Sequence, residues 1–146
     1  MKTAKDKVVF KASGDVEIVA GKADENKLPT FAFHGYTGEA MSVEGFFHPV
    51  IVDLAGATLA DPITALMAHD DSIGGIIGQG TAVKNDAGIF ATGTVMAEDA
   101  AAQKLISLSK NGFKWQASIG ASINRREFLD AGKKTTVNGR EVSGPL

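Results

Sequence analysis

Two residues in this chain have the type and setting for nucleophilic chemistry, and the first is a serine in an alternating stretch. Ser118 lies within residues 113–122, where apolar residues alternate with polar or small ones. This alternation is typical of a half-buried strand, and it places Ser118 on the face opposite Trp115 and Ile119. Gly120 is two positions further along the face of Ser118 and has no side chain, so space is left beside the hydroxyl.

The second residue is a histidine that could accept the serine proton. A serine hydroxyl is a poor nucleophile until a base removes its proton, and the chain has three histidines. His34 and His48 are flanked by aromatic residues and by glycine or proline, a setting typical of hydrogen-bonded structural histidines. His69 follows the apolar run 65–68, with two aspartates and then glycines after it. This position suits a general base, so we predict a functional pair of His69 and Ser118.

The serine also has a simpler interpretation. A solvent-facing sheet carries polar residues that have no catalytic role. The residues around Ser118 match only the second glycine of the nucleophile elbow G-x-S-x-G, and they lie within a strand instead of at a strand-to-helix turn. An α/β-hydrolase is therefore not indicated.

Three other clusters resemble functional motifs, and we expect none of them to be a site. His69-Asp70-Asp71 could suggest a metal site, but adjacent residues on an extended chain point to opposite faces. Residues 74–80 are glycine-rich but lack the G-x-G-x-x-G order and the Lys-Ser/Thr of phosphate loops, which favours a strand or bulge. Arg126 shares the face of Ser118, but at about 3.3 Å per residue it lies roughly 26 Å away. We expect Arg126 and Arg125 to be solvated charges.

The composition indicates one globular domain. The chain has 146 residues, of which 44% are apolar and 22% charged. A net charge of −2 gives no basic field for nucleic acid, and the lack of cysteine excludes disulfides, thiolate catalysis and sulfur-ligated metals. No apolar run approaches the roughly 18 residues of a membrane-spanning helix, and the N-terminus lacks the core of a signal peptide. We expect a soluble, cytoplasmic protein whose partner is a protein or a small molecule.

The elements that must position the pair are mostly strands. One helix is predicted from Glu98 to Asn111, after which Gly112 turns the chain into the strand of Ser118. Period-two patterns and turn residues predict a first hairpin, further strands, a second hairpin after the turn 85–88 and a third around Asn138-Gly139. Their residues are 8–12 with 16–20 (first hairpin), 31–33 and 50–54 (strands), 82–83 with 89–95 (second hairpin) and 135–142 (third hairpin).

The third hairpin suggests that the chain is truncated. Its return strand begins at Arg140, yet the sequence stops at Leu146, and Pro145 has no N–H to donate to a sheet. We therefore expect residues 1–146 to be a single domain that lacks its final strands and a scaffold region.

Five motifs in a fixed order resemble those of a known protein family. They are Ala68-His69-Asp70, the glycine-rich stretch after it, residues 88–93, the helix, and residues 115–121. Together they resemble the prohead maturation proteases of tailed bacteriophages, and more closely the Mu-type protease that is joined to a scaffolding region. The resemblance covers about Phe31 to Glu141.

The resemblance implies a serine endopeptidase with a herpesvirus-assemblin-like fold, which is α+β, mainly β, with a β-barrel core and surrounding helices. In that family the histidine of the His-Asp motif matches His69, and the serine of the small-residue strand matches Ser118. The implied reaction is acyl transfer: His69 takes the proton of Ser118, Ser118 attacks a peptide carbonyl, and backbone N–H groups stabilise the oxyanion. No metal or cofactor is required.

The resemblance also implies partners, a location and a third catalytic residue. The substrates would be the phage scaffolding protein, the major capsid protein and the protease itself, cleaved inside the assembling procapsid in the host cytoplasm. A homodimer is expected by analogy with the herpesvirus enzymes, and no nucleic-acid or membrane partner is expected. The third residue, acidic or histidine, follows the serine strand and is expected beyond Leu146. Glu141 and His48 are substitutes that the sequence leaves unassigned, and without a third member cleavage should be slow.

Two alternatives stay open at this point. The chain could be a non-enzymatic β-rich structural module of a phage particle, in which case His69 and Ser118 should lie far apart. It could also be a self-cleaved product, a hypothesis motivated by the abrupt end at Leu146.

Overall fold

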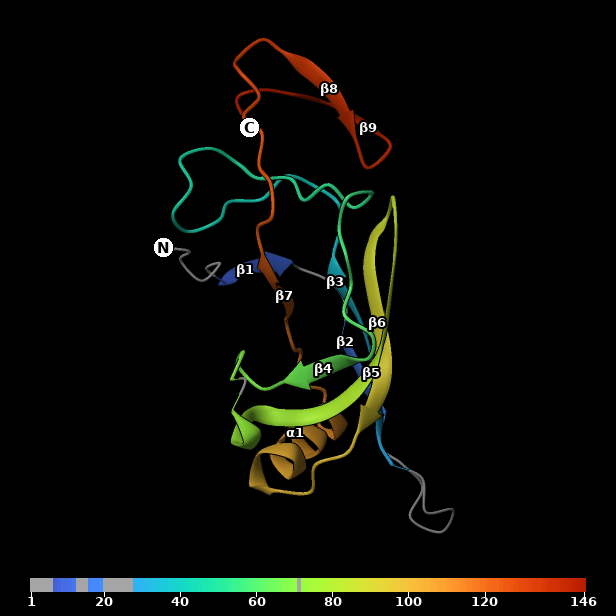
Figure 1. Ribbon diagram of the computed structural model, residues 1–146. Coiled ribbons are helices and arrows are strands. Elements are labelled where there is room, and N and C mark those ends of the chain that lie inside the picture. Colours follow the sequence, from blue (N-terminus) through green and yellow to red (C-terminus); the bar gives the residue numbers. More distant parts are fainter. Residues whose placement is uncertain (1–6, 13–15, 20–27, 71) are drawn as a thin grey trace.

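The fold is mainly β, as the sequence predicts. The computed structural model describes residues 7–12, 16–19, 28–70 and 72–146, and Figure 1 labels its elements. No helix among these residues has the length and apolarity needed to cross a membrane. The elements are β1 (Lys7–Ala12), β2 (Val16–Val19), β3 (Thr30–Tyr36), β4 (Ile63–Leu66), a short 3-10 helix (Ile73–Gly75), β5 (Ile76–Asn85), β6 (Gly88–Val95), α1 (Ala100–Lys110), β7 (Ala117–Ser122), β8 (Lys134–Val137) and β9 (Arg140–Ser143).

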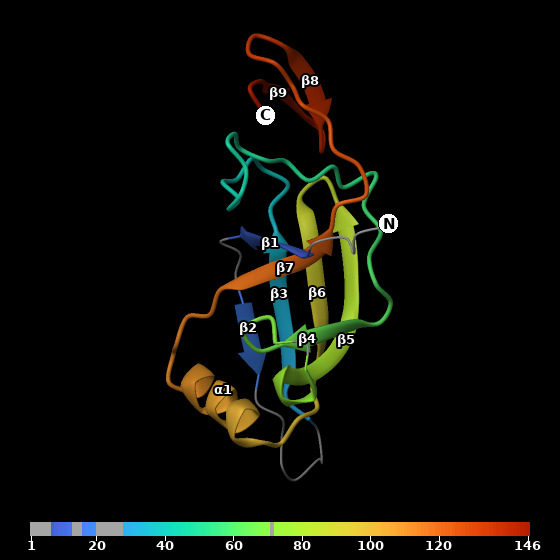
Figure 2. The ribbon, with the colours of Figure 1, turned by 60° about the vertical axis from the view of Figure 1, so that its left-hand side comes forward.

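The largest sheet is antiparallel and has the strand order β2-β3-β6-β5-β4 (Figure 2). Its edges are β2 and β4, so this sheet is open, and the described strands do not close it into a barrel. The hairpin predicted around the turn 85–88 is confirmed as β5 and β6. In it, Asn85 pairs with Gly88, and the side-chain Oδ1 of Asn85 accepts the backbone N–H of Ala87 at 2.8 Å.

The strand that carries Ser118 belongs to a separate two-stranded ribbon. β7 pairs antiparallel with β1, from Ala117 opposite Ala12 to Ser122 opposite Lys7. This ribbon crosses the face of the large sheet (Figure 2) and contacts it where Cγ2 of Ile119 lies 3.2 Å from the Cβ position of Gly35. β7 is therefore held against β3 by its own apolar face.

The first predicted hairpin is wrong. Residues 8–12 and 16–19 are strands, but β1 pairs with β7 and β2 pairs with β3, while the expected turn 13–15 and residue 20 lie outside the described residues. Alternation predicts that a strand has one buried face and says nothing about which strand lies beside it. Here β1 pairs with a strand more than a hundred residues away, and β2 pairs with the next strand in the chain.

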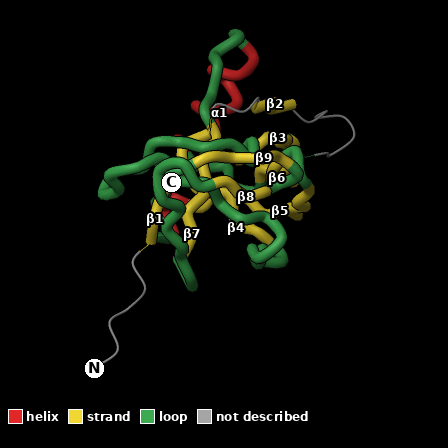
Figure 3. Tube along the Cα trace, turned by 90° about the horizontal axis from the view of Figure 1, so that it is seen from above, coloured by secondary structure: helices red, strands yellow, loops and turns green. Residues whose placement is uncertain are grey.

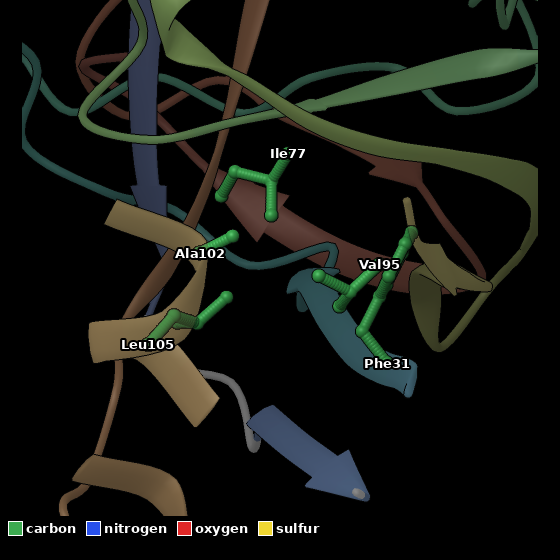
Figure 4. Close-up of a cluster of buried hydrophobic side chains, with 5 residues drawn as sticks. All are labelled: Phe31, Ile77, Val95, Ala102 and Leu105. Carbon is green, nitrogen blue, oxygen red and sulfur yellow. The ribbon is translucent and has the colours of Figure 1, made fainter. Parts of the chain in front are cut away.

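The main core lies between α1 and the large sheet, as Figure 4 shows for five buried side chains. The helix begins at Asp99, whose carboxylate accepts the backbone N–H of Ala102 at 3.1 Å, and it lies within the predicted range 98–111. Each large side chain buried here stabilises the fold by about 1.5–3 kcal/mol. The cluster consists of Phe31, Ile77, Val95, Ala102 and Leu105.

The strand that carries Ser118 is shorter than predicted. The alternation begins at Phe113, but the strand begins at Ala117. The reason is Trp115, whose indole N–H donates to Oγ of Ser109 at 2.8 Å and whose ring packs against the α1 core. Trp115 thus ties residues 113–116 to the helix and not to a neighbouring strand.

The long loop of residues 37–62 and the hairpin of β8 and β9 cover one end of the sheet. Seen from above in Figure 3, β8 and β9 lie over the ends of the sheet strands, and the turn Asn138-Gly139 joins them as predicted. The predicted strand 50–54 is wrong, because only Val50 makes a bridge, to Met41. Val52, two residues further on, donates its N–H to the hydroxyl of Tyr36 at 3.0 Å, so a side chain replaces a neighbouring strand.

Candidate functional site

The imidazole of His69 and the hydroxyl of Ser118 are hydrogen-bonded, Nε2 to Oγ. His69 lies in the loop that follows β4 of the large sheet, and Ser118 lies on β7 of the two-stranded ribbon (Figure 1). Ser118 is half-buried and His69 is exposed, which leaves the pair open to solvent. The structure therefore brings together the two residues that the sequence singled out.

The position of Ser118 follows from the alternation of β7. Ala117 is 9% exposed, and Ile119 packs with the buried cluster of Tyr36 and Leu54. Ser118 lies between them and points to the other face of the ribbon. The apolar neighbours of the serine thus fix its strand, while its hydroxyl stays available.

The position of His69 is fixed by a tight loop after β4. The backbone N–H of Met67 donates to the carbonyl of Gly75 at 2.8 Å, and the N–H of Asp70 donates back to the carbonyl of Met67 at 3.0 Å. Between them Ala68 has φ 53° and His69 has φ 56°. Left-handed backbone costs a non-glycine residue about 1–2 kcal/mol. Strain of this kind concentrates at functional sites, so it supports a special role for His69.

The carboxylate beside His69 is bonded to its own loop. Oδ1 of Asp70 accepts the hydroxyl of Ser72 at 2.6 Å and the backbone N–H of Ser72 at 3.0 Å. The hydroxyl bond first, and then the backbone bond, lower the pKa of the Asp70 carboxyl below its usual value. Among the described residues the imidazole of His69 has one hydrogen-bonding partner, Ser118, and Asp70 is not bonded to it.

Neither substitute for a third catalytic residue is bonded to His69. Glu141 lies 3.7 Å from the ammonium of Lys134 in the β8–β9 hairpin, which is at the other end of the molecule from β4 in Figure 1. His48 packs its ring against Phe128, with the ring centres 5.3 Å apart. Both side chains are therefore occupied elsewhere in the fold.

The other candidate residues have structural or solvated positions. Nε2 of His34 is hydrogen-bonded to the carbonyl of Ala87 at 2.8 Å, and its ring stacks on Phe90, as expected for a structural histidine. Arg125 forms an exposed ion pair with Glu127, and Arg126 is also exposed, as expected for solvated charges.

The metal and phosphate interpretations gain no support from the geometry. Within the described ranges, no three His, Asp or Glu side chains lie close enough to hold a metal ion, and Asp71 lies outside those ranges. The glycine-rich segment forms the 3-10 helix and the start of β5, which fits the expected strand or bulge. A Cβ at Gly78 would lie 1.9 Å from the carbonyl oxygen of Thr94, so this glycine serves the close approach of β5 and β6.

Two residues of the loop were missed by sequence reasoning. Ser72 supplies both hydrogen bonds to Asp70, and Gly75 lets the 3-10 helix lie against Asp70. The signal that could have found Ser72 is the order Asp-x-Ser, because Asp often accepts a hydrogen bond from the backbone two residues later. No local signal distinguishes Gly75 from its neighbour Gly74.

Those two glycines provide a matched test of the loop. A Cβ at Gly75 would lie 2.0 Å from the backbone oxygen of Asp70, whereas at Gly74 the nearest atom is Oγ of Ser72 at 3.9 Å. We expect Gly75→Ala to lower the free energy of unfolding by about 1–3 kcal/mol, because the loop must shift. Gly74→Ala should change it by less than about 0.5 kcal/mol. Urea unfolding compares the two, and equal losses would contradict a close contact at Gly75.

Comparison with protein-family models, with curated proteins and with solved structures found no match for this chain. A histidine nitrogen bonded to a serine hydroxyl is the arrangement that nucleophilic catalysis by serine requires.

Proposed function

We propose that this chain is a serine endopeptidase of the phage prohead maturation type, with Ser118 as the nucleophile and His69 as the general base. The observation that carries the proposal is the hydrogen bond between Nε2 of His69 and Oγ of Ser118. The order of the sequence motifs and the left-handed backbone at His69 support it further.

The proposed reaction is acyl transfer in two steps. Nε2 of His69 accepts the hydroxyl proton as Oγ of Ser118 bonds to the carbonyl carbon of a peptide. His69 then gives this proton to the amine that leaves, and an ester remains on Ser118. Water, deprotonated by the same imidazole, then attacks the ester carbonyl, and His69 returns the proton to Oγ of Ser118 as the acid leaves. Backbone N–H groups near Ser118 would stabilise the negative oxygen in both steps.

The proposal extends to the fold, the substrates and the location. The ribbon of β1 and β7, which crosses the face of the open sheet, supports a herpesvirus-protease-like core in which the two layers together form a barrel-like body. The proposed substrates are the scaffolding protein, the major capsid protein and the chain itself, cleaved inside the procapsid in the host cytoplasm. The proposed assembly is a homodimer.

The alternative is a non-enzymatic β-rich structural module of a phage particle. That hypothesis predicts a large distance between the imidazole of His69 and the hydroxyl of Ser118. The hydrogen bond between them favours the enzyme.

The proposal can be tested with a reagent that phosphorylates activated serines. Diisopropyl fluorophosphate should transfer its phosphoryl group to Oγ of Ser118, with fluoride as the leaving group, and peptide mass spectrometry should locate the adduct. Ser118→Ala should give no adduct. Ser122→Ala should react like the unaltered chain. Ser122 is an exposed serine four residues after Ser118, on the same face of β7. An unmodified Ser118 in the unaltered chain would contradict the proposal.

A further inference from the structure

We propose that Asp70 is a positioning residue, whose carboxylate closes the loop that holds the imidazole of His69 against Ser118. The catalytic consequence of this inference rests on the proposed function, whereas the structural part does not. The inference assigns Asp70 a role through the backbone and not through contact with substrate.

His69 lies within a turn that two backbone hydrogen bonds close. Met67 bonds to Gly75 at 2.8 Å across the base of the loop, and Asp70 bonds back to Met67 at 3.0 Å. Ala68 and His69 are the two residues enclosed by the second bond, and both are left-handed. The hydrogen bonds of Met67 and Asp70 therefore hold the backbone of Ala68 and His69 in place from either side.

One carboxylate oxygen, Oδ1 of Asp70, holds the part of the loop that follows His69. Oδ1 of Asp70 accepts both the hydroxyl of Ser72 at 2.6 Å and the N–H of Ser72 at 3.0 Å. Ser72 in turn accepts the N–H of Gly75 at 2.9 Å with its carbonyl. A chain of bonds therefore runs from the carboxylate of Asp70 to the base of the loop.

The backbone of Asp70 also lies close against Gly75. The backbone oxygen of Asp70 lies 2.0 Å from the place where a Cβ of Gly75 would be, and Gly75 is buried. If the bonds of Asp70 to Ser72 were lost, the strained residues Ala68 and His69 could relax, and the imidazole would leave Ser118. Hydrogen bonds to an ionised carboxylate are stronger than those to a neutral acceptor, which suits an exposed loop. The lowered pKa of Asp70 is consistent with an ionised carboxylate in these bonds.

Asp70 acts on His69 through the loop and not by direct contact with the imidazole. The carboxylate of Asp70 is bonded to Ser72 and not to His69, so its charge does not orient the imidazole by contact. A carboxamide keeps one oxygen that can accept the same two bonds. Asp70→Asn should therefore preserve the site, whereas Asp70→Ala should not.

The experiment compares Asp70→Ala, Asp70→Asn and the unaltered chain by the rate at which diisopropyl fluorophosphate modifies Ser118. We expect Asp70→Ala to slow the reaction by about 10²-fold, because a shift of about 1 Å in a catalytic group has that effect. Asp70→Asn should slow the reaction much less than Asp70→Ala, because the carboxamide oxygen can keep both bonds in a weaker form. Asp53→Ala is the matched control, since Oδ1 of Asp53 also accepts an N–H two residues later, from Ala55 at 3.2 Å, in another loop. It should leave the rate unchanged.

Nuclear magnetic resonance of the His69 ring provides the second readout, which needs no activity. The ring signals should shift in Asp70→Ala and return to their original positions in Asp70→Asn. Equal rates for Asp70→Ala and the unaltered chain, or equal losses for the alanine and asparagine variants, would overturn the inference. If the unaltered chain is not modified at all, the proposed function fails, and the ring signals still decide whether Asp70 positions His69.

Discussion

Replacing His69 with asparagine should lower the rate of the proposed scaffold cleavage by about 10⁴-fold, because general base catalysis contributes up to that factor. Asparagine is chosen because it tolerates the left-handed backbone of His69, where φ is 56°. The variant therefore removes the base and keeps the loop. Cleavage is followed by co-expression with the scaffolding protein and by the rate of product formation on gels.

Ser118→Ala should cause a loss of the same size, and the double variant should lose no more than either single one. In the proposed mechanism the two residues act as one unit, so removing the second has no further effect once the first is gone. Ser118→Ala should change the free energy of unfolding by less than about 0.5 kcal/mol, because the side chain is only half-buried. Ser122→Ala is the control and should cleave normally. Cleavage that continues in either His69→Asn or Ser118→Ala would remove that residue from the mechanism.

The parts of the fold that could be predicted from the sequence are those set by neighbouring residues. The turn 85–88 and the pair Asn138-Gly139 join strands that follow each other directly, so turn chemistry alone predicts both hairpins. The helix is similar, because its N-terminal cap at Asp99 and its apolar face are local features. In each case the residues that determine the structure lie beside it in the chain.

The parts that could not be predicted depend on residues far away. β1 and β7 pair across more than a hundred residues, and the period-two pattern of either strand fits several partners equally well. Residues 50–54 have a strand-like pattern, yet the N–H groups of Val52 and Leu54 bond to the side chains of Tyr36 and Asn138. Local propensity cannot reveal that a distant side chain will replace a neighbouring strand.

The candidate site divides differently, because the predicted pair is distant in sequence, whereas the residues that were missed lie close to His69 in the chain. The types of His69 and Ser118 and the motifs around them predicted a functional pair, and the geometry brings the two side chains together. The loop that sets the imidazole was not predicted, because Ser72 and Gly75 act through Asp70 and the backbone and carry no chemistry themselves. The sequence motifs indicated the two side chains that the structure brings together, but they did not indicate the residues of the loop around His69.

The second large expected effect concerns stability at the other end of the molecule, where Asn138→Ala should lower the free energy of unfolding by about 3–4 kcal/mol. Asn138 is 8% exposed, and its side chain makes three hydrogen bonds to the long loop. Oδ1 accepts the N–H of Leu54 at 2.9 Å, and Nδ2 donates to the carbonyls of Gly38 at 3.0 Å and Val52 at 2.9 Å. Each bond contributes about 1 kcal/mol. The left-handed backbone, with φ 54°, adds about 1 kcal/mol for alanine.

Two further variants separate the causes of that loss. Asn138→Gly also removes the three bonds but accepts a positive φ, so it should be more stable than Asn138→Ala by up to about 1 kcal/mol. Asn138→Asp keeps the acceptor for Leu54 but turns an oxygen toward the carbonyls of Gly38 and Val52, so it should be at least as destabilised as the alanine variant. Urea unfolding measures all three against Thr136→Ala, an exposed change in the same hairpin that should have little effect. A loss below about 1 kcal/mol for Asn138→Ala would mean that water replaces these bonds, and that the hairpin does not hold the long loop in place.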